Sequence, residues 1–125
     1  MDKTTILVIE NNKIILLCIE TILKEKGFDV ISTQCSIEAL SIINSTNIKL
    51  IICNMITPEL SGQELFNILK ENSKYSNIPF IMTTGSINEQ KRAQPKTEGI
   101  LAIIPRNNLI KELIAELQNF EKLNK

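Results

Sequence analysis

Short apolar runs alternate with longer segments of helical periodicity along most of the chain. Most runs are continuous rather than alternating, and they cover residues 6–9, 28–31, 50–53, 80–82 and 100–104. Continuous apolar strands are typical of a parallel sheet that helices cover on both faces. The run at 28–31 contains Asp29, so we place that strand nearer the sheet edge. The alternation predicts the α/β class, with a doubly wound sheet of five parallel strands in a three-layer αβα arrangement.

The segments between these runs carry the spacing and capping residues of amphipathic helices. A first helix is expected to start at Asn11 or Asn12, and Ser36 is the expected N-cap of a shorter second helix. Residues 61–64 match a capping box, and the last helix is expected to start near Asn108. The apolar residues that we expect the four helices to bury are Ile15, Cys18, Ile19, Ile22 and Leu23; Ala39, Leu40 and Ile43; Leu65, Ile68 and Leu69; and Ile110, Leu113, Ile114 and Leu117.

The segment 88–98 lacks an apolar face of this kind. Its residues offer almost nothing apolar for docking, and Pro95 biases Gln94 away from helical dihedral angles. We therefore expect the fourth helix to be short, frayed or absent. The segment is either an ordinary solvated loop or helix face, or a surface that contacts a partner.

Length and charge narrow the class of protein. A chain of 125 residues, 43% of them hydrophobic, is expected to form one domain over residues 1–125 with a sizeable core. Its 14 basic and 14 acidic residues cancel, so no overall field draws it to nucleic acid or to a membrane. No signal peptide is recognisable, and no apolar run approaches the roughly 20 residues that cross a bilayer. We expect a soluble, cytoplasmic protein.

Neither the cysteines nor the motifs indicate an enzyme. Cys18, Cys35 and Cys53 show no CxxC spacing and lie in or next to apolar runs, so we interpret them as reduced thiols. The absence of histidine excludes His-based acid/base catalysis and zinc–histidine sites. No P-loop, GxGxxG or GxSxG motif is present, and the loop 10–13 lacks the glycines and hydroxyls of a phosphate-wrapping flavin site. We predict no enzymatic activity and no cofactor.

Polar residues follow the predicted strands where each strand ends. In a doubly wound sheet the site lies at the carboxyl ends of the strands, where the strand order reverses. The residues that follow the first, third, fourth and fifth strands, and that we expect to converge there, are Glu10 with Asn11, Asn54, Thr84 and Arg106.

These segments, in this order, resemble response regulator receiver domains, the CheY-like family. Residues 6–12 resemble the family's opening strand and acidic pair, and 49–62 resemble its phosphoacceptor segment. Residues 78–85 are similar to its fourth strand and switch hydroxyl, and 99–106 to its fifth strand and lysine. The resemblance implies a flavodoxin-like fold with strand order 2-1-3-4-5, which is the order of receiver proteins. It also implies a role in two-component, phosphorelay signal transduction.

The charged residues depart from the family pattern. Where the family has an acidic pair that holds Mg²⁺, this chain has Glu10 and Asn11, and Asn54 stands in the place of the phosphoacceptor aspartate. Arg106 replaces the lysine, whereas Thr84 is unchanged. Mg²⁺ needs carboxylate or phosphate oxygens, and an amide is not the nucleophile of aspartyl-phosphate chemistry. We therefore expect Mg²⁺ binding to be lost or weak, and Asn54 to stay unphosphorylated.

The altered pocket has one carboxylate and one cation. We hypothesise that Glu10 and Arg106 pair directly, while Asn11 and Asn54 complete the hydrogen-bond network, because a lone carboxylate in a cleft is costly. The alternative is that Arg106 extends into solvent and the amides bind water.

The switch that would report phosphorylation also departs from the family pattern. Thr84 keeps the switch hydroxyl, but Ile103 stands where the family carries an aromatic residue. We therefore predict a pseudo-receiver, a phosphorylation-independent protein-interaction module of a signalling pathway. The alternative is a working phosphoacceptor of a two-component phosphorelay that uses a modified acidic pocket.

The expected partner is another protein of the pathway, bound through the face built from residues 87–117. We expect a monomer or a weak homodimer. Because the chain stops at Lys125, we expect no DNA-binding or catalytic output of its own, in a protein that is either free-standing or a piece of a larger regulator.

Overall fold

The computed structural model describes residues 4–85 and 99–123. Strands and helices alternate along these residues, in the order β1 (Thr5–Ile9), α1 (Lys13–Glu25), β2 (Asp29–Thr33), α2 (Ser36–Ser45), β3 (Leu50–Asn54), α3 (Gly62–Lys70), β4 (Phe80–Thr84), β5 (Ala102–Pro105), the 3-10 helix η1 (Arg106–Asn108) and α5 (Leu109–Leu123). The predicted short or frayed fourth helix lies outside the described residues.

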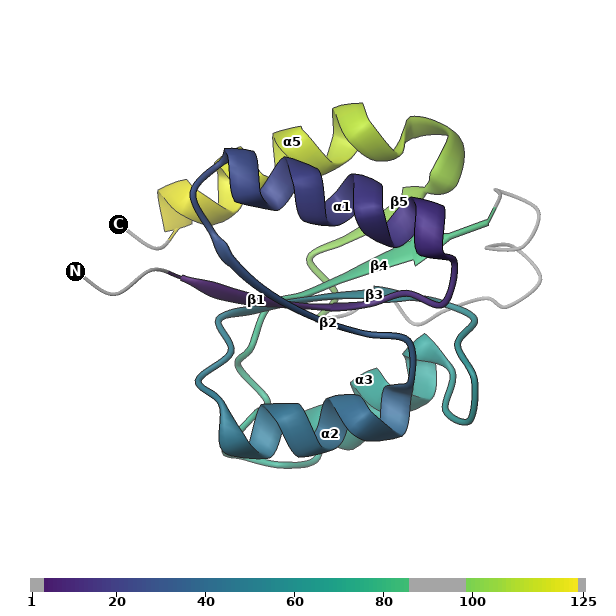
Figure 1. The fold of residues 1–125 in the computed structure, drawn as a ribbon. Helices are drawn as coiled ribbons and strands as arrows, with labels where there is room; N and C mark the ends of the chain where they lie inside the picture. The colour runs from purple at the N-terminus through teal and green to yellow at the C-terminus, as the bar shows by residue number, and fades with distance from the viewer. Residues whose placement is uncertain (1–3, 86–98, 124–125) are drawn as a thin grey trace.

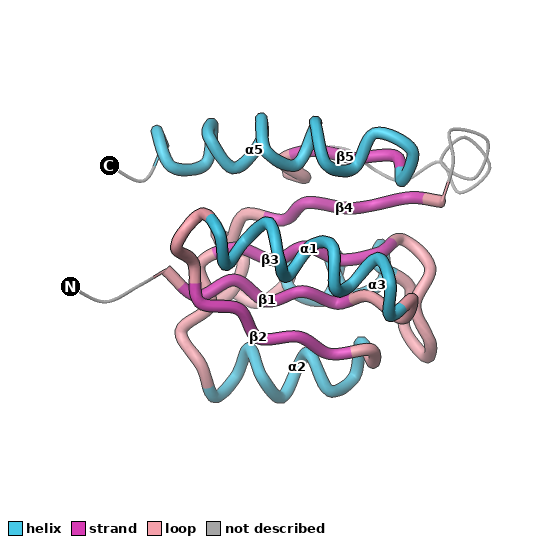
Figure 2. Tube along the Cα trace, turned by 45° about the horizontal axis from the view of Figure 1, so that its top comes forward, coloured by secondary structure: helices cyan, strands magenta, loops and turns pink. Residues whose placement is uncertain are grey.

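All strands of the described chain form one parallel sheet in the order β2-β1-β3-β4-β5. Helices α1 and α5 cover one face of the sheet, and α2 and α3 cover the other (Figure 1). The strand that contains Asp29 lies at one edge, as its charge predicted (Figure 2). The predicted fold class and strand order are confirmed.

The register brings the carboxyl ends of the inner strands together. Because parallel strands share one direction, residues paired near the end of one strand lie near the end of its neighbour. The Cα pairs nearest this edge are Ile9 with Cys53, Asn54 with Thr83, and Thr84 with Pro105.

Two apolar clusters form the core, one on each face of the sheet. Successive side chains of a strand point to opposite faces. In β1, Ile6 and Val8 therefore pack beneath α1 and α5, whereas Leu7 and Ile9 pack above α2 and α3. All four are fully buried, and each such side chain contributes about 1.5–3 kcal/mol to stability.

The caps at two helix starts agree with the sequence patterns. Asn12 Oδ1 accepts hydrogen bonds from the backbone N–H groups of residues 14 and 15 at 3.0 and 3.1 Å, which caps α1. At α3, Ser61 Oγ accepts from Glu64 N at 3.1 Å and Glu64 Oε1 accepts from Ser61 N at 2.9 Å. Both orphan donors of the capping box are thus satisfied.

The predicted role of Ser36 is wrong. The N-cap of α2 is Cys35, whose side chain makes no capping hydrogen bond. Ser36 is the first helical residue and is fully buried, with its hydroxyl donating to Pro58 O at 2.8 Å and accepting from Leu60 N at 2.9 Å. The hydroxyl therefore ties α2 to the connection between β3 and α3.

Two residues predicted to be buried are exposed instead. Ile68 is 42% and Ile110 is 58% exposed. In α3 the buried stripe includes Phe66 rather than Ile68, and in α5 it runs through Leu109, Leu113, Leu117 and Phe120. Leu109 belongs to this stripe, and its neighbour Ile110 lies about 100° around the helix, on the exposed side.

No helix in the described ranges has the combination of length and apolar character that membrane crossing requires.

Candidate functional site

Four of the predicted site positions gather at the carboxyl edge of the sheet, as the topology requires. A shallow cavity of about 270 Å³ opens there, and its lining consists of Asn11, Asn12, Asn54, Ile56 and Arg106. Glu10 lies behind this lining and is 1% exposed. The residues that the sequence pattern singled out therefore lie together at this edge of the sheet.

The central contact of the site joins Glu10 to Asn54. Asn54 Nδ2 donates hydrogen bonds to Glu10 Oε1 and Oε2, each at 3.0 Å, and Asn12 N donates to Oε2 at 2.9 Å. Asn54 is 4% exposed, and its Oδ1 accepts from Ile56 N at 3.1 Å. The carboxylate only accepts hydrogen bonds, so the amide must turn its nitrogen toward Glu10. Backbone and side-chain N–H groups thus satisfy the buried carboxylate without a cation.

The predicted direct pair of Glu10 and Arg106 is wrong in this structure. No hydrogen bond or ion pair joins the two side chains, although both lie within the described ranges, and Arg106 is exposed. Asn11 is also exposed. The backbone N–H of Asn12, rather than the side chain of Asn11, donates the hydrogen bond to Glu10. The alternative, in which Arg106 extends into solvent, describes this residue correctly.

The predicted switch residues lie on the α2/α3 side of the sheet. Thr84 is 1% exposed, and its hydroxyl has no hydrogen-bond partner among the described residues. Ile103 pairs in register with Met82, which lies two residues before Thr84 on the same side of β4. Ile103 is half-buried against the α2/α3-side cluster.

Cys53 adjoins the site but faces the core. Its thiol is fully buried and donates to Asn54 O at 3.3 Å. Burial, with a smaller contribution from the charge of Glu10, raises the pKa of the Cys53 thiol far above its usual range. The thiol therefore stays protonated at neutral pH, which confirms the interpretation of this residue as a core thiol. Cys18 and Cys35 are also free thiols and are half-buried.

Within the described ranges, no group of three or more His, Cys, Asp or Glu side chains is placed to hold a metal ion. Of the acids near the site, Glu10 is the one inside it, and its oxygens already accept the hydrogen bonds described above.

Two contributors to the site were missed from the sequence. Asn12 was recognised as a candidate helix cap, but its backbone donation to Glu10 has no sequence signal. Ile56 is 57% exposed at the rim of the cavity. The one sequence feature that pointed to Ile56 as a lining residue was its place shortly after Asn54 in the turn.

Comparison with known proteins decides the family. Residues 6–118 match the response regulator receiver domain family. The chain belongs to that family. Receiver domains are signalling modules, and this receiver domain has the architecture expected of one.

Relatives of known sequence cover different parts of the chain. PilG of Pseudomonas aeruginosa is 33% identical over 81 residues, which are 65% of this receiver domain and 60% of PilG. The probable transcriptional regulator ycf27 of Porphyridium aerugineum is 37% identical over 84 residues, 67% of this chain and 34% of that protein. The chain thus spans less than two thirds of either relative. DivK of Brucella ovis, a polar-differentiation response regulator, is 22% identical, with 93% of this chain and 94% of DivK covered.

Solved structures agree closely in fold. The receiver domain of the Francisella response regulator 1452 superposes with a TM-score of 0.84 at 26% identity, covering 98% of this chain and 100% of that one. The receiver domain of the sensor histidine kinase PA1611 from Pseudomonas aeruginosa PAO1 superposes with a TM-score of 0.82 at 20% identity, covering 95% and 98%. That structure has a magnesium ion coordinated in its active-site cleft.

Proposed function

We propose that this receiver domain is a pseudo-receiver, a protein-interaction module of two-component signalling that works without phosphorylation. The observation that carries the proposal is the pair of 3.0 Å hydrogen bonds from Asn54 Nδ2 to Glu10. Because the group beside the buried carboxylate is an amide donor, the pocket lacks the charge repulsion that two neighbouring carboxylates would produce.

The first support is chemical. In the family pattern, Asn54 occupies the place of the aspartate that attacks the phosphoryl group. An amide oxygen carries little negative charge, and the amide nitrogen lone pair is delocalised, so neither atom is a competent nucleophile. Here Asn54 Oδ1 also accepts a hydrogen bond from Ile56 N, which further engages that oxygen.

The second support concerns Mg²⁺. The ion takes oxygen ligands in near-octahedral geometry and loses water reluctantly. At this site one carboxylate is present, and both its oxygens accept N–H donors at 2.9–3.0 Å. These donors occupy three of the roughly four acceptor positions of the carboxylate. The donor set therefore fits Mg²⁺ poorly, and we propose that binding is lost or weak.

The third support is that the buried carboxylate of Glu10 is already satisfied. The buried Glu10 carboxylate has three N–H···O contacts without phosphate or metal, and Arg106 remains in solvent. The carboxylate therefore needs neither a metal ion nor a phosphoryl group to complete its contacts. Ile103 adds no polar group that exchanges between core and water. We propose that the domain presents one conformation to its partner.

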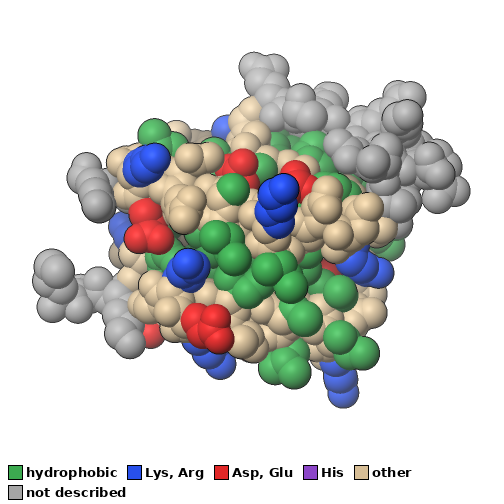
Figure 3. All heavy atoms as spheres, turned by 90° about the horizontal axis from the view of Figure 1, so that it is seen from above, with side chains coloured by type: hydrophobic (Ala, Val, Ile, Leu, Met, Phe, Trp, Pro, Cys, Tyr) green, Lys and Arg blue, Asp and Glu red, His purple; other side chains and the backbone are tan. Residues whose placement is uncertain are grey.

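For the partner, we propose a protein that binds the face built from residues 87–117, of which 99–117 are described. Figure 3 looks down on the layer of α1 and α5 and shows hydrophobic side chains gathered there. Ile110 of α5 lies in the proposed face and is 58% exposed, and Ile14 and Leu17 of α1, outside that range, are 75% and 64% exposed. Exposed apolar patches of this kind often mark interaction sites. The proposed oligomeric state is a monomer or a weak homodimer, and light scattering over a concentration series measures it.

The test is direct phosphorylation. The protein is incubated with acetyl phosphate and Mg²⁺ and its intact mass is measured, beside an active receiver domain as a positive control. We expect no phosphoryl adduct on this chain. A stable adduct would overturn the proposal and favour the alternative, a phosphoacceptor of a phosphorelay with a modified acidic pocket.

A further inference from the structure

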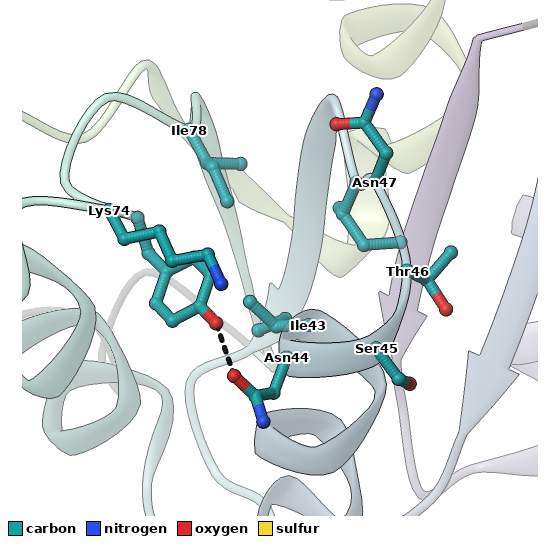
Figure 4. A pocket seen from close by; sticks show the side chains of 9 residues that line it. Ile43, Asn44, Ser45, Thr46, Asn47, Lys74 and Ile78 are labelled. Atoms are coloured by element: carbon teal, nitrogen blue, oxygen red, sulfur yellow. Dashed lines mark hydrogen bonds between the residues drawn. The ribbon is translucent and has the colours of Figure 1, made fainter.

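A second cavity lies at the amino end of the sheet, at the opposite end of the strands from Asn54. It has a volume of about 370 Å³ and lies between the end of α2, the α2–β3 connection and the α3–β4 connection (Figure 4). Its lining consists of Ile43, Asn44, Ser45, Thr46, Asn47, Ile48, Lys74, Tyr75 and Ile78. Small-molecule pockets range over about 300–1,000 Å³, so the cavity has the size of a binding site for a small ligand.

One part of the lining is apolar and anchored in the core. Ile43 and Ile48 are 3% and 4% exposed, and Tyr75 and Ile78 pack against the same α2/α3-side cluster. Tyr75 and Ile78, which are half-buried, are therefore the apolar side chains that a ligand in the cavity could contact. Such a surface favours a flat or ring-shaped apolar group.

The polar part of the lining is held in place across two chain segments. Tyr75 Oη donates to Asn44 Oδ1 at 2.6 Å, which joins the α3–β4 connection to the end of α2, as the dashed line in Figure 4 shows. In Figure 4 the amide nitrogen of Asn44 points away from Lys74, with Oδ1 and the phenol between them. The contact therefore holds the Tyr75 ring in place before any ligand arrives.

The charge of the lining is positive. Lys74 is the one charged residue among those that line the cavity, and no acid accompanies it. Its backbone N–H donates to Asn72 Oδ1 at 2.9 Å, and its ammonium lies 5.5 Å from the centroid of the Tyr75 ring. No ion pair engages Lys74 within the described ranges. An ammonium beside an aromatic ring and an apolar side chain can bind an anionic group that carries an apolar part.

We propose that this cavity binds a small organic anion that carries an apolar ring. The anionic group would contact Lys74 Nζ, and the ring would lie on the half-buried side chains of Tyr75 and Ile78. Such a site is independent of phosphorylation chemistry, since it shares no residue with the Glu10–Asn54 site.

The experiment is an NMR titration with sodium benzoate as the probe and benzamide as its neutral counterpart of the same shape. Tyr75 is the only tyrosine in the chain, so its ring protons report the cavity without ambiguity. With benzoate, we expect saturable shifts of the Tyr75 ring protons and of the backbone amides of Asn44 and Ile78. Benzamide is expected to bind at least about tenfold more weakly than benzoate. Equal binding of the two compounds, or no saturable shift, would contradict the proposal.

Matched lysine variants separate the site from general charge effects. Lys74→Gln is expected to weaken benzoate binding about tenfold or more, and Lys74→Arg to retain it. Lys49→Gln removes an exposed lysine that does not line the cavity, and it should bind benzoate as the wild type does. If Lys74→Gln binds as well as Lys49→Gln, the cavity is not an anion site, and Lys74 has only the structural role of a cation near the C-terminal end of α2.

Discussion

One amide nitrogen of Asn54 donates to both carboxylate oxygens of Glu10, each at 3.0 Å, and both residues are buried. The contact joins residues that are 44 positions apart in the sequence: Glu10 directly follows β1, and Asn54 ends the neighbouring strand β3. It makes an uncharged side chain the main partner of the buried anion. The stability and the chemistry of the site both depend on which group stands at position 54.

Asn54→Asp is expected to destabilise the fold by about 1–3 kcal/mol at neutral pH, because it removes two N–H donors and brings two buried carboxylates together. The mutual repulsion raises the folded-state pKa of one carboxyl above its unfolded value. The destabilisation is therefore greatest above that raised pKa and diminishes as the pH falls through it. Thermal unfolding over a pH series measures this. Mg²⁺ should raise the melting temperature of the variant and leave that of the wild type unchanged, and an equal rise in both would contradict the prediction.

Restoring the family residues together is expected to restore phosphorylation. A variant that combines Asn54→Asp, Asn11→Asp and Arg106→Lys supplies the nucleophile, a second carboxylate and the lysine. We expect a phosphoryl adduct with acetyl phosphate and Mg²⁺ in this variant and none in Asn54→Gln, as measured by intact mass. No adduct on the combined variant would show that elements beyond these positions have been lost.

Cys53 is expected to resist alkylation in the folded protein. Burial and then the charge of Glu10 raise the pKa of its thiol, so the reactive thiolate is scarce. Iodoacetamide at pH 8 should label Cys18 and Cys35 first and Cys53 only on unfolding, as peptide mapping shows. Because the folded pKa exceeds the ordinary value of 9.0, the stability that the neutral thiol contributes is complete below that pH and is lost as the pH rises further. The variant Cys53→Ala should lack this alkaline loss.

Gly62→Ala is expected to disturb the site, although Gly62 is not adjacent to Asn54 in the sequence. A Cβ at this position would lie 2.7 Å from Asn54 O and 3.1 Å from Met55 Cα, so backbone atoms must shift. We expect a loss of about 1–3 kcal/mol, together with altered NMR shifts of Asn54. Gly27→Ala is the control, because nothing lies within 4 Å of its Cβ and only its φ of +91° adds cost. If only Gly27→Ala destabilises, the close approach at Gly62 carries no energetic weight.

Ser36→Ala is expected to cost about 1–3 kcal/mol, because the lost hydroxyl leaves Pro58 O and Leu60 N without their partner in a buried setting. Ser45→Ala removes an exposed hydroxyl that donates to Ser41 O, and it should change stability by less than about 0.5 kcal/mol. Urea unfolding compares the two. Equal effects would mean that the link between α2 and the β3–α3 connection is not a stabilising one.

Local sequence patterns predicted most of the architecture. Continuous apolar runs indicated strands that are buried on both sides, and the Asn12 and Ser61–Glu64 caps indicated two helix starts, because such patterns act through neighbours in the chain. The boundaries were less accurate. β5 begins at Ala102 rather than at Ile100, since the start of a strand depends on where its neighbour offers hydrogen bonds.

By itself, the sequence determined the fold class, the strand order that its family resemblance implied, and the sheet edge at which Glu10, Asn54 and Arg106 gather. Only the tertiary structure decided which of them touch. Asn54 reaches Glu10, whereas Arg106 extends into water, and Ser36 is buried against the β3–α3 connection instead of capping its helix. The physical reason is range: hydrophobic periodicity and caps act within a few residues, but a hydrogen bond near 3 Å depends on how distant segments are positioned by the whole packed sheet.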